Sequence, residues 1–265
     1  MIDVHCHLAD NKFKCDLPEI LEAARRAEIR KIVAVAEFPS QFDRLIEICQ
    51  QNPGFVYAGI GVHPIQKRNK AAKLKHLENV ESYLSRFQQY IVCVGEIGLD
   101  HTSSQFKLSV DDLKEQEDVF RKQLEYSRQF DLPVNVHSRS APLRTIEVLR
   151  SENIENVILH AFDGNQEEAA MGVQAGYYFS VPPSFERSAD TLEVVKTIPM
   201  ENLLLETDAP ALGPLKGERN EPKNLEASVD IISKCVQNGP KLLVMEFSSK
   251  LSVLIGHSPE SLHLI

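Results

Sequence analysis

Short apolar runs alternate with longer amphipathic segments along almost the whole chain. The short runs are rich in Val, Ile and Leu, which is typical of buried parallel strands, and the longer segments repeat their apolar residues with the period of a helix. The predicted strands are residues 2–4, 31–36, 55–61, 91–94, 133–136, 156–159, 177–181 and 202–205. The predicted helices are residues 17–27, 40–51, 72–87, 111–130, 142–151, 166–175, 189–197 and 225–238, with a last helix at 245–255.

Eight strands that each lead into a helix predict an α/β fold, a (β/α)8 TIM barrel. No linker rich in Pro, Gly or Ser divides the chain, so residues 1–265 are expected to form a single domain. A doubly wound open sheet shows the same alternation of strands and helices, so the apolar pattern alone leaves that alternative open. The placement of the polar residues favours the barrel.

Side chains that can bind metals or anions follow seven of the eight predicted strands. In a barrel the carboxyl ends of all strands meet around one mouth, whereas the edge strands of an open sheet cannot contribute to one site. Five of the nine histidines lie at these strand ends. The residues at these positions are His5, His7, Glu37, His63, Glu96, Asp100, His137, Arg139, His160, Glu206 and Asp208.

This set of side chains predicts a centre with two divalent metal ions. Alternate residues of a strand point the same way, so the imidazoles of His5 and His7 are expected to face one ion. Taken singly, each candidate is as readily explained as a turn, cap or hydrogen-bonded residue, and only their joint placement favours a metal site. We predict that one ion is bound by His5, His7 and Asp208, that the other is bound by His137 and His160, and that Glu96 bridges both.

A centre of this kind predicts hydrolysis. Water held between two metal ions becomes hydroxide-like near neutral pH, because metal binding lowers its pKa. Asp208 and Glu96 are therefore the predicted catalytic residues. Mixed imidazole and carboxylate ligands suit Zn²⁺ and Mn²⁺, and they suit Mg²⁺ when water completes the coordination.

The remaining strand-end residues predict how substrate and ligands are oriented. Arg139 can present a two-pronged donor to a phosphate and His63 can add a hydrogen bond or a positive charge, so both are predicted to bind a substrate phosphate. Glu206 and Asp100 are predicted to orient the metal ligands from behind. Glu37 is left without a predicted role.

Charge and cysteine content narrow the substrate and the compartment. A formal net charge of −9 argues against wrapping of duplex DNA, but it leaves a short single-stranded end as a substrate. The basic stretches at 67–75 and 216–223 are interpreted more simply as solvated charges than as a surface that binds nucleic acid.

Five cysteines without a CxxC spacing argue against disulfides and thiolate zinc sites. No leader or bilayer-spanning run is evident, so we expect an intracellular protein, cytoplasmic or nuclear, without a membrane partner or an obligate protein partner.

The strand-end motifs also resemble a known family. In chain order they are DVHCHL at 3–8, GVHP at 61–64, GEIGLD at 95–100, VHSR at 136–139, HAFDG at 160–164, ETDAP at 206–210 and RNEP at 219–222. Together they resemble the TatD family of metal-dependent deoxyribonucleases. Residues 36–38, 133–141 and 209–214 are most similar to its eukaryotic TatD DNase domain-containing protein 3 branch.

This resemblance implies a barrel of the amidohydrolase type, two or three divalent ions, and phosphodiester hydrolysis that often proceeds from the 3′ end of DNA. It implies the same ligand set, with Glu96 as the bridge. Two positions depart from the family pattern and have no predicted role. Glu37 stands where many bacterial members have a small hydroxyl residue, and His101 stands where an aromatic residue is common.

The leading hypothesis is a deoxyribonuclease that acts exonucleolytically on DNA ends through a hydroxide bridging the two ions. The alternative is a small-molecule amidohydrolase that cleaves a lactone, an amide or a phosphate ester at the same centre. The acidic net charge and the absence of Trp favour this alternative, because proteins that bind single strands usually present aromatic platforms. A non-catalytic metal scaffold would require a lost ligand, and no ligand is missing.

Overall fold

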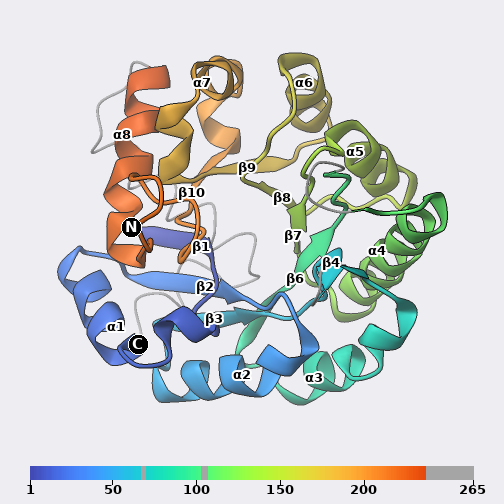
Figure 1. The fold of residues 1–265 in the computed structure, drawn as a ribbon, viewed down its shortest axis with the longest axis horizontal. Helices are drawn as coiled ribbons and strands as arrows, with labels where there is room; N and C mark the ends of the chain where they lie inside the picture. The colour runs from blue at the N-terminus through green and yellow to red at the C-terminus, as the bar shows by residue number, and fades with distance from the viewer. Residues whose placement is uncertain (67–69, 103–106, 237–265) are drawn as a thin grey trace.

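The computed structural model describes residues 1–66, 70–102 and 107–236. Its main sheet has eight parallel strands in the order β1-β2-β3-β6-β7-β8-β9-β10, so each strand pairs with its neighbours along the chain. The strands curl into a ring with the helices outside it (Figure 1). The predicted barrel is confirmed, and the open doubly wound sheet is wrong because β1 and β10 lie side by side. The last predicted helix, 245–255, lies outside the described residues.

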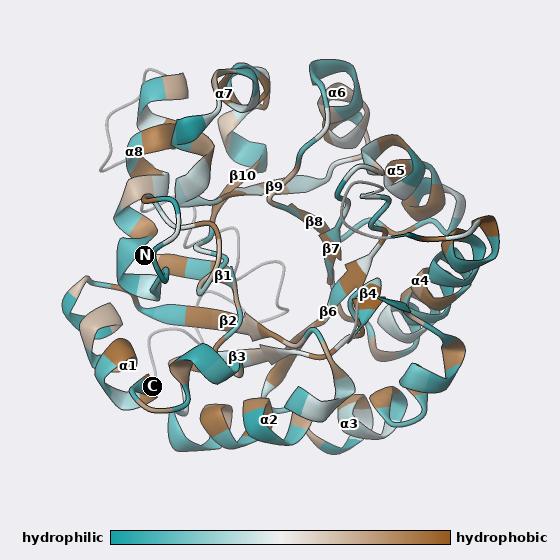
Figure 2. Cartoon of the chain, in the orientation of Figure 1, coloured by the Kyte–Doolittle hydropathy of each residue, from teal (hydrophilic) through white to brown (hydrophobic). Residues whose placement is uncertain are grey.

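The elements agree closely with the apolar pattern. Hydrophobic residues follow the strands, and hydrophobic and hydrophilic bands alternate on the surrounding helices (Figure 2). The barrel strands are β1 (Ile2–Cys6), β2 (Lys31–Val35), β3 (Val56–Gly59), β6 (Ile91–Gly98), β7 (Val134–His137), β8 (Val157–His160), β9 (Tyr178–Val181) and β10 (Leu203–Leu205). The helices are α1 (Leu17–Arg26), α2 (Phe42–Gln51), α3 (Val80–Arg86), α4 (Val110–Phe130), α5 (Pro142–Ser151), α6 (Gln166–Gln174), α7 (Ala189–Val195) and α8 (Leu225–Val236).

The first and last strands are joined by the residues that follow β10. The backbone N–H of Asp208 donates to the carbonyl of His5 at 2.9 Å, and the N–H of His7 donates to the carbonyl of Ala209 at 2.7 Å. Behind them the buried side chain of Asp3 accepts hydrogen bonds from the Thr207 hydroxyl at 2.6 Å and from the Thr207 N–H at 3.0 Å. The contacts that close the barrel therefore also bring Asp208 to the two histidines of β1.

Strand β6 is longer than predicted and includes Glu96, which we expected after the strand. Its pairing with β7 shifts register between Gly95 and Ile97. Gly98 has a φ of +139°, and a Cβ there would lie 2.0 Å from the carbonyl oxygen of His137, so only glycine fits. The glycines that indicated a loop instead let β6 and β7 approach closely at the centre of the barrel mouth.

The prediction is wrong between residues 65 and 87, where one helix was expected at 72–87. The chain instead forms a short hairpin, β4 (Ile65–Gln66) and β5 (Lys70–Ala71), then the 3-10 helix η3 (Leu74–Leu77), and only then α3. The N–H of Lys73 donates to Nδ1 of His76 at 3.0 Å, which stabilises the separate first turn. Two-residue strands carry no periodic signal, so the hairpin could not be predicted.

Among the described residues, no helix combines the length and the apolar character that crossing a membrane would require.

Candidate metal centre

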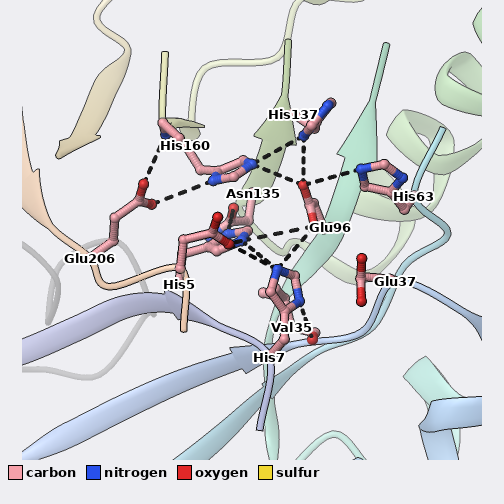
Figure 3. A network of polar contacts seen from close by, with 12 residues as sticks. His5, His7, Val35, Glu37, His63, Glu96, Asn135, His137, His160 and Glu206 are labelled. Atoms are coloured by element: carbon pink, nitrogen blue, oxygen red, sulfur yellow. Dashed lines mark hydrogen bonds and ion pairs between the residues drawn. The ribbon is translucent and has the colours of Figure 1, made fainter. Parts of the chain in front are cut away.

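The structure brings six predicted ligand residues together at the carboxyl end of the barrel (Figure 3). Their side chains come from β1 and the residue that follows it, from β6, β7 and β8, and from the segment after β10, and all six residues are buried. Burial of so many polar groups is unfavourable unless each finds a partner or an ion. The six are His5, His7, Glu96, His137, His160 and Asp208.

Glu96 lies between two pairs of imidazoles. Its Oε1 is 2.9 Å from Nδ1 of His137 and 2.9 Å from Nε2 of His160. Its Oε2 is 3.8 Å from Nε2 of His5 and 3.7 Å from Nε2 of His7. Each oxygen of one carboxylate therefore faces a different histidine pair, which is the arrangement that a bridging ligand requires.

Asp208 lies on the side of the first pair. Its Oδ1 is 3.0 Å from Nε2 of His7 and 3.4 Å from Nε2 of His5. Burial alone would raise the pKa of Asp208, but hydrogen bonds from the two imidazoles hold the pKa well below its usual range. The residue has a φ of +53°, a left-handed conformation that Asp tolerates better than most residues.

The first histidine pair is oriented by neutral oxygen atoms. Nδ1 of His5 lies 2.8 Å from the amide oxygen of Asn135, whose own NH2 group donates to the carbonyl of Val4 at 3.0 Å. Nδ1 of His7 lies 3.3 Å from the carbonyl of Val35. With a metal ion bound, a proton on each Nδ1 would leave each Nε2 with a lone pair directed into the centre. Without an ion, Nε2 can carry the proton that it donates to Asp208.

The second histidine pair is oriented by carboxylates. Nε2 of His137 lies 3.1 Å from Oδ2 of Asp100, and Nδ1 of His160 lies 3.6 Å from Oε2 of Glu206. Burial opposes ionisation of Asp100, but the hydrogen bond from His137 lowers the pKa of Asp100 below its usual range. Glu206 in turn accepts a hydrogen bond from the Ser180 hydroxyl at 2.6 Å.

The donor set fits divalent cations. The inward nitrogens of His5 and His7 are 3.3 Å apart, and those of His137 and His160 are 3.2 Å apart. Imidazole nitrogens at these distances repel unless a proton or a metal ion lies between them. Four such nitrogens with two anionic carboxylates match the preferences of Zn²⁺ and Mn²⁺. The division of these ligands between two ions remains a prediction.

His63 and Glu37 border the same space (Figure 3). Nε2 of His63 is 3.7 Å from Oε1 of Glu96, and its Nδ1 lies 3.0 Å from the N–H of Ile65. Burial lowers the pKa of His63 to about 4, so near neutral pH it offers a hydrogen bond and no positive charge. Burial raises the pKa of the half-buried Glu37 carboxyl, and the nearby charge of Glu96 acts in the same direction.

Arg139 is not brought into contact with the buried ligands. It is half-buried on the loop after β7, where its carbonyl accepts a hydrogen bond from the N–H of His101 at 3.0 Å. Within the described part of the chain, its guanidinium makes no hydrogen bond or ion pair. Its predicted contact with phosphate therefore requires a bound substrate.

Asn135 is one of the residues around the site that sequence reasoning missed. It is a polar residue inside the apolar run of β7, and it is fully buried. A buried amide in a strand needs hydrogen-bond partners, so its position in Val134-Asn135-Val136 was the available signal. The sequence could not show that the partner is His5.

Comparison with known proteins agrees with this geometry. Residues 2–250 match the family described as TatD related DNase. Deoxyribonuclease TATDN3 of Homo sapiens is 40% identical over 238 residues, which cover 88% of this chain and 86% of that protein. A relative from Danio rerio, described as putative deoxyribonuclease tatdn3, is 39% identical over 252 residues, which cover 94% of each chain.

Solved structures agree on the fold. The crystal structure of YJJV, a TatD homologue from Escherichia coli, superposes with a TM-score of 0.86 at 27% identity and covers 97% of this chain and 98% of its own. The predicted barrel, the predicted family and the prediction of a metal-dependent hydrolase acting on ester bonds are confirmed. The chain belongs to the TatD-related DNase family.

Proposed function

We propose that this protein hydrolyses phosphodiester bonds of DNA and removes nucleotides from the ends of single strands. The observation that carries the proposal is the position of Glu96, whose two oxygens face two separate histidine pairs. A carboxylate shared by two metal sites is the arrangement used for in-line displacement at phosphorus. Relatives named as deoxyribonucleases support DNA as the substrate.

The proposal assigns the ions to the residues at the centre. His5, His7 and Asp208 would hold one divalent ion, His137 and His160 the other, and Glu96 both. Bound there, the ions supply Lewis acidity, which stabilises negative charge on phosphoryl oxygens and acidifies water.

The protein's own side chains position the reactants. Asp208 remains anionic because the imidazoles lower its pKa, so its carboxylate can accept a hydrogen bond from the attacking water and orient it. His63 is neutral and can donate from Nε2 to a phosphate oxygen. Arg139 would bind a second phosphate oxygen from the rim, where it is free to form a bidentate contact.

The acidic net charge supports action on strand ends. At a net charge of −9 the protein cannot neutralise many duplex phosphates, and phosphate neutralisation supplies most of the affinity of non-specific duplex binding. A strand end requires only local contacts at the barrel mouth. We therefore propose stepwise removal of nucleotides rather than cleavage within a duplex.

The test uses single-stranded oligonucleotides labelled at the 3′ or the 5′ end, incubated with the protein in Mn²⁺ and in Mg²⁺. Asp208→Asn and Arg139→Ala should each slow stepwise release of mononucleotides by about a hundredfold. Asp131→Asn and Arg150→Ala are matched controls: Asp131 also has a left-handed backbone, with a φ of +51°, and Arg150 is an exposed residue in the last turn of α5.

Three results would reject parts of the proposal. No cleavage of DNA in either metal, with ions still bound, would favour the small-molecule amidohydrolase. Full activity of Arg139→Ala would reject its role in phosphate binding. Products cut from within the strand would reject action from the ends.

A further inference from the structure

A cationic pocket lies beside the metal centre and is not used by the mechanism above. It has a volume of about 540 Å³ and lies between the loop after β2 and the β4–β5 hairpin with η3. Both segments follow strands that end at the barrel mouth, so the residues that line the pocket lie on the same side of the barrel as the metal centre. Residues that line it include Phe38, Gln66, Lys70, Lys73, Lys75 and His76.

Gln66 connects the pocket to the centre. Its side-chain NH2 group donates to the carbonyl of Glu37 at 3.1 Å and to the carbonyl of His63 at 2.8 Å. The N–H of His63 also donates to the carbonyl of Glu37 at 3.0 Å. These bonds hold the two loops together, so the pocket wall and the rim of the metal centre form one continuous structure.

The positive charge of the pocket is only partly compensated by nearby acids. Lys73 is paired with Glu115, with Nζ 2.6 Å from Oε2. Lys70 and Lys75 are exposed, and neither forms an ion pair with another residue of the described chain. Lys70 lies near enough to Asp112 to contribute to the lowered pKa of that carboxyl, after the hydrogen bonds from Ser109. The ammonium groups of Lys70 and Lys75 can still attract an anionic ligand to the pocket, and this local charge contrasts with a net charge of −9 for the whole chain.

The chemistry of the pocket matches a nucleotide strand. The lysines can contact backbone phosphates, and Phe38 offers an apolar wall of the kind on which a base or sugar packs. A small-molecule substrate held at the ions would not need a second cationic site next to the centre. Two lining residues lie close in sequence to residues that border the metal centre, since Phe38 follows Glu37 and Gln66 is three residues after His63.

We propose that this pocket binds the nucleotides of single-stranded DNA that flank the scissile phosphodiester, with Lys70 and Lys75 contacting backbone phosphates. The proposal rests on the proposed nuclease function and adds a substrate-binding subsite to it. The subsite predicts that affinity increases with strand length until the strand reaches the two lysines.

The first test measures binding of fluorescent phosphorothioate oligonucleotides of increasing length, which resist cleavage. The variant Lys70→Gln/Lys75→Gln should bind long strands roughly tenfold more weakly, and its log–log salt dependence should be shallower by about 1.4, the effect of two lost phosphate contacts. The matched control is Arg30→Gln/Arg150→Gln, which removes the same charge from exposed residues at the opposite end of the barrel. Equal binding by the two double variants would overturn the proposal.

The second test separates the pocket from the metal centre. Bis(p-nitrophenyl) phosphate is a small diester that reaches only the centre, so Lys70→Gln/Lys75→Gln should hydrolyse it at the wild-type rate while its KM for long single strands rises. Loss of both activities together would show that the lysines act on the centre, and would overturn the subsite. A wild-type protein that cleaves neither substrate would reject the nuclease function, while the binding comparison would still decide the role of the pocket.

Discussion

The two halves of the metal centre are built differently. The half with His5 and His7 has a carboxylate, Asp208, in direct contact with the imidazoles, and only neutral oxygens behind them. The half with His137 and His160 has no carboxylate of its own beyond the shared Glu96. Its imidazoles are instead backed by two carboxylates, those of Asp100 and Glu206.

Asp3 is a further group without negative charge behind His5 and His7. It is buried on the seam behind the first half, and burial raises its pKa to about 8, so it is largely protonated near neutral pH. Negative charge therefore contacts the imidazoles of the first half directly through Asp208, and lies behind the imidazoles of the second half in Asp100 and Glu206. A carboxylate behind an imidazole makes the ring a stronger ligand, so we expect the second half to bind an ion more tightly through its histidines.

Glu96→Gln should have the largest effect because it weakens both halves at once. An amide cannot offer two anionic oxygens, so we expect the loss of at least one ion. DNA cleavage should fall by more than about a hundredfold, which exceeds the loss expected when a residue that only hydrogen-bonds to a metal ligand is replaced. Metal content by mass spectrometry and turnover measure the two effects. Glu201→Gln, at an exposed position before β10, is the control. Full metal content together with full activity would disprove the bridge.

Asp208→Asn should weaken metal binding only in the half with His5 and His7. Asn tolerates the left-handed backbone and removes the one direct carboxylate, so we expect about a hundredfold loss of turnover and weaker binding of one ion. Stepwise chelator titration distinguishes the loss of one ion from the loss of two. Asp131→Asn should match the wild type. Simultaneous loss of both ions would show that the halves do not bind metal independently.

Asp100→Asn should weaken the second half from behind. The ring of His137 would lose its anionic partner, and we expect a 10- to 100-fold loss of affinity for one ion, with the ion at His5 and His7 retained. Competition with a chromogenic chelator gives the two affinities. Asp118→Asn, on the exposed face of α4, is the control. An unchanged pair of affinities would mean that the carboxylate only positions the ring.

Asp3→Asn tests whether the residue behind the first half is neutral. The measured quantity is the free energy of unfolding of the metal-free protein. The folded-state pKa of Asp3 is about 8 against an ordinary value of 3.8, so the folded protein retains a proton that the unfolded chain releases between these values. This contribution to stability is complete below pH 4 and is lost as the pH rises to 8, by at most about 1.4 kcal/mol per pH unit. Asn does not titrate, so the stability of the variant lacks this dependence on pH. Urea unfolding between pH 5 and 8 should show curves that diverge as the pH rises, and parallel curves would show that Asp3 is ionised in the fold.

Most of the fold could be predicted because strand and helix periods are local properties of the chain. All eight barrel strands were located within a few residues, but β6 was cut short because its glycines are typical of loops. The hairpin of β4 and β5 and the split before α3 were missed because their signals extend over only two to four residues.

The candidate site could be predicted as a set of residues, because the carboxyl ends of barrel strands converge. Glu206 and Asp100 were predicted to orient metal ligands, but the sequence did not show which histidine each of them contacts. Asn135, Asp3 and Gln66 were missed, since the sequence does not show which groups a buried polar side chain meets.

The sequence by itself determined the strand and helix pattern, the ligand types at the strand ends and the family to which the chain belongs. Only the tertiary structure decided that Asp208 reaches His7, 201 residues away, and that the oxygens of Glu96 face different histidine pairs. It also decided that two separate loops form one cationic pocket. The physical reason is that local periodicity depends on neighbours along the chain, whereas these contacts depend on the closure of the barrel and the register between its strands.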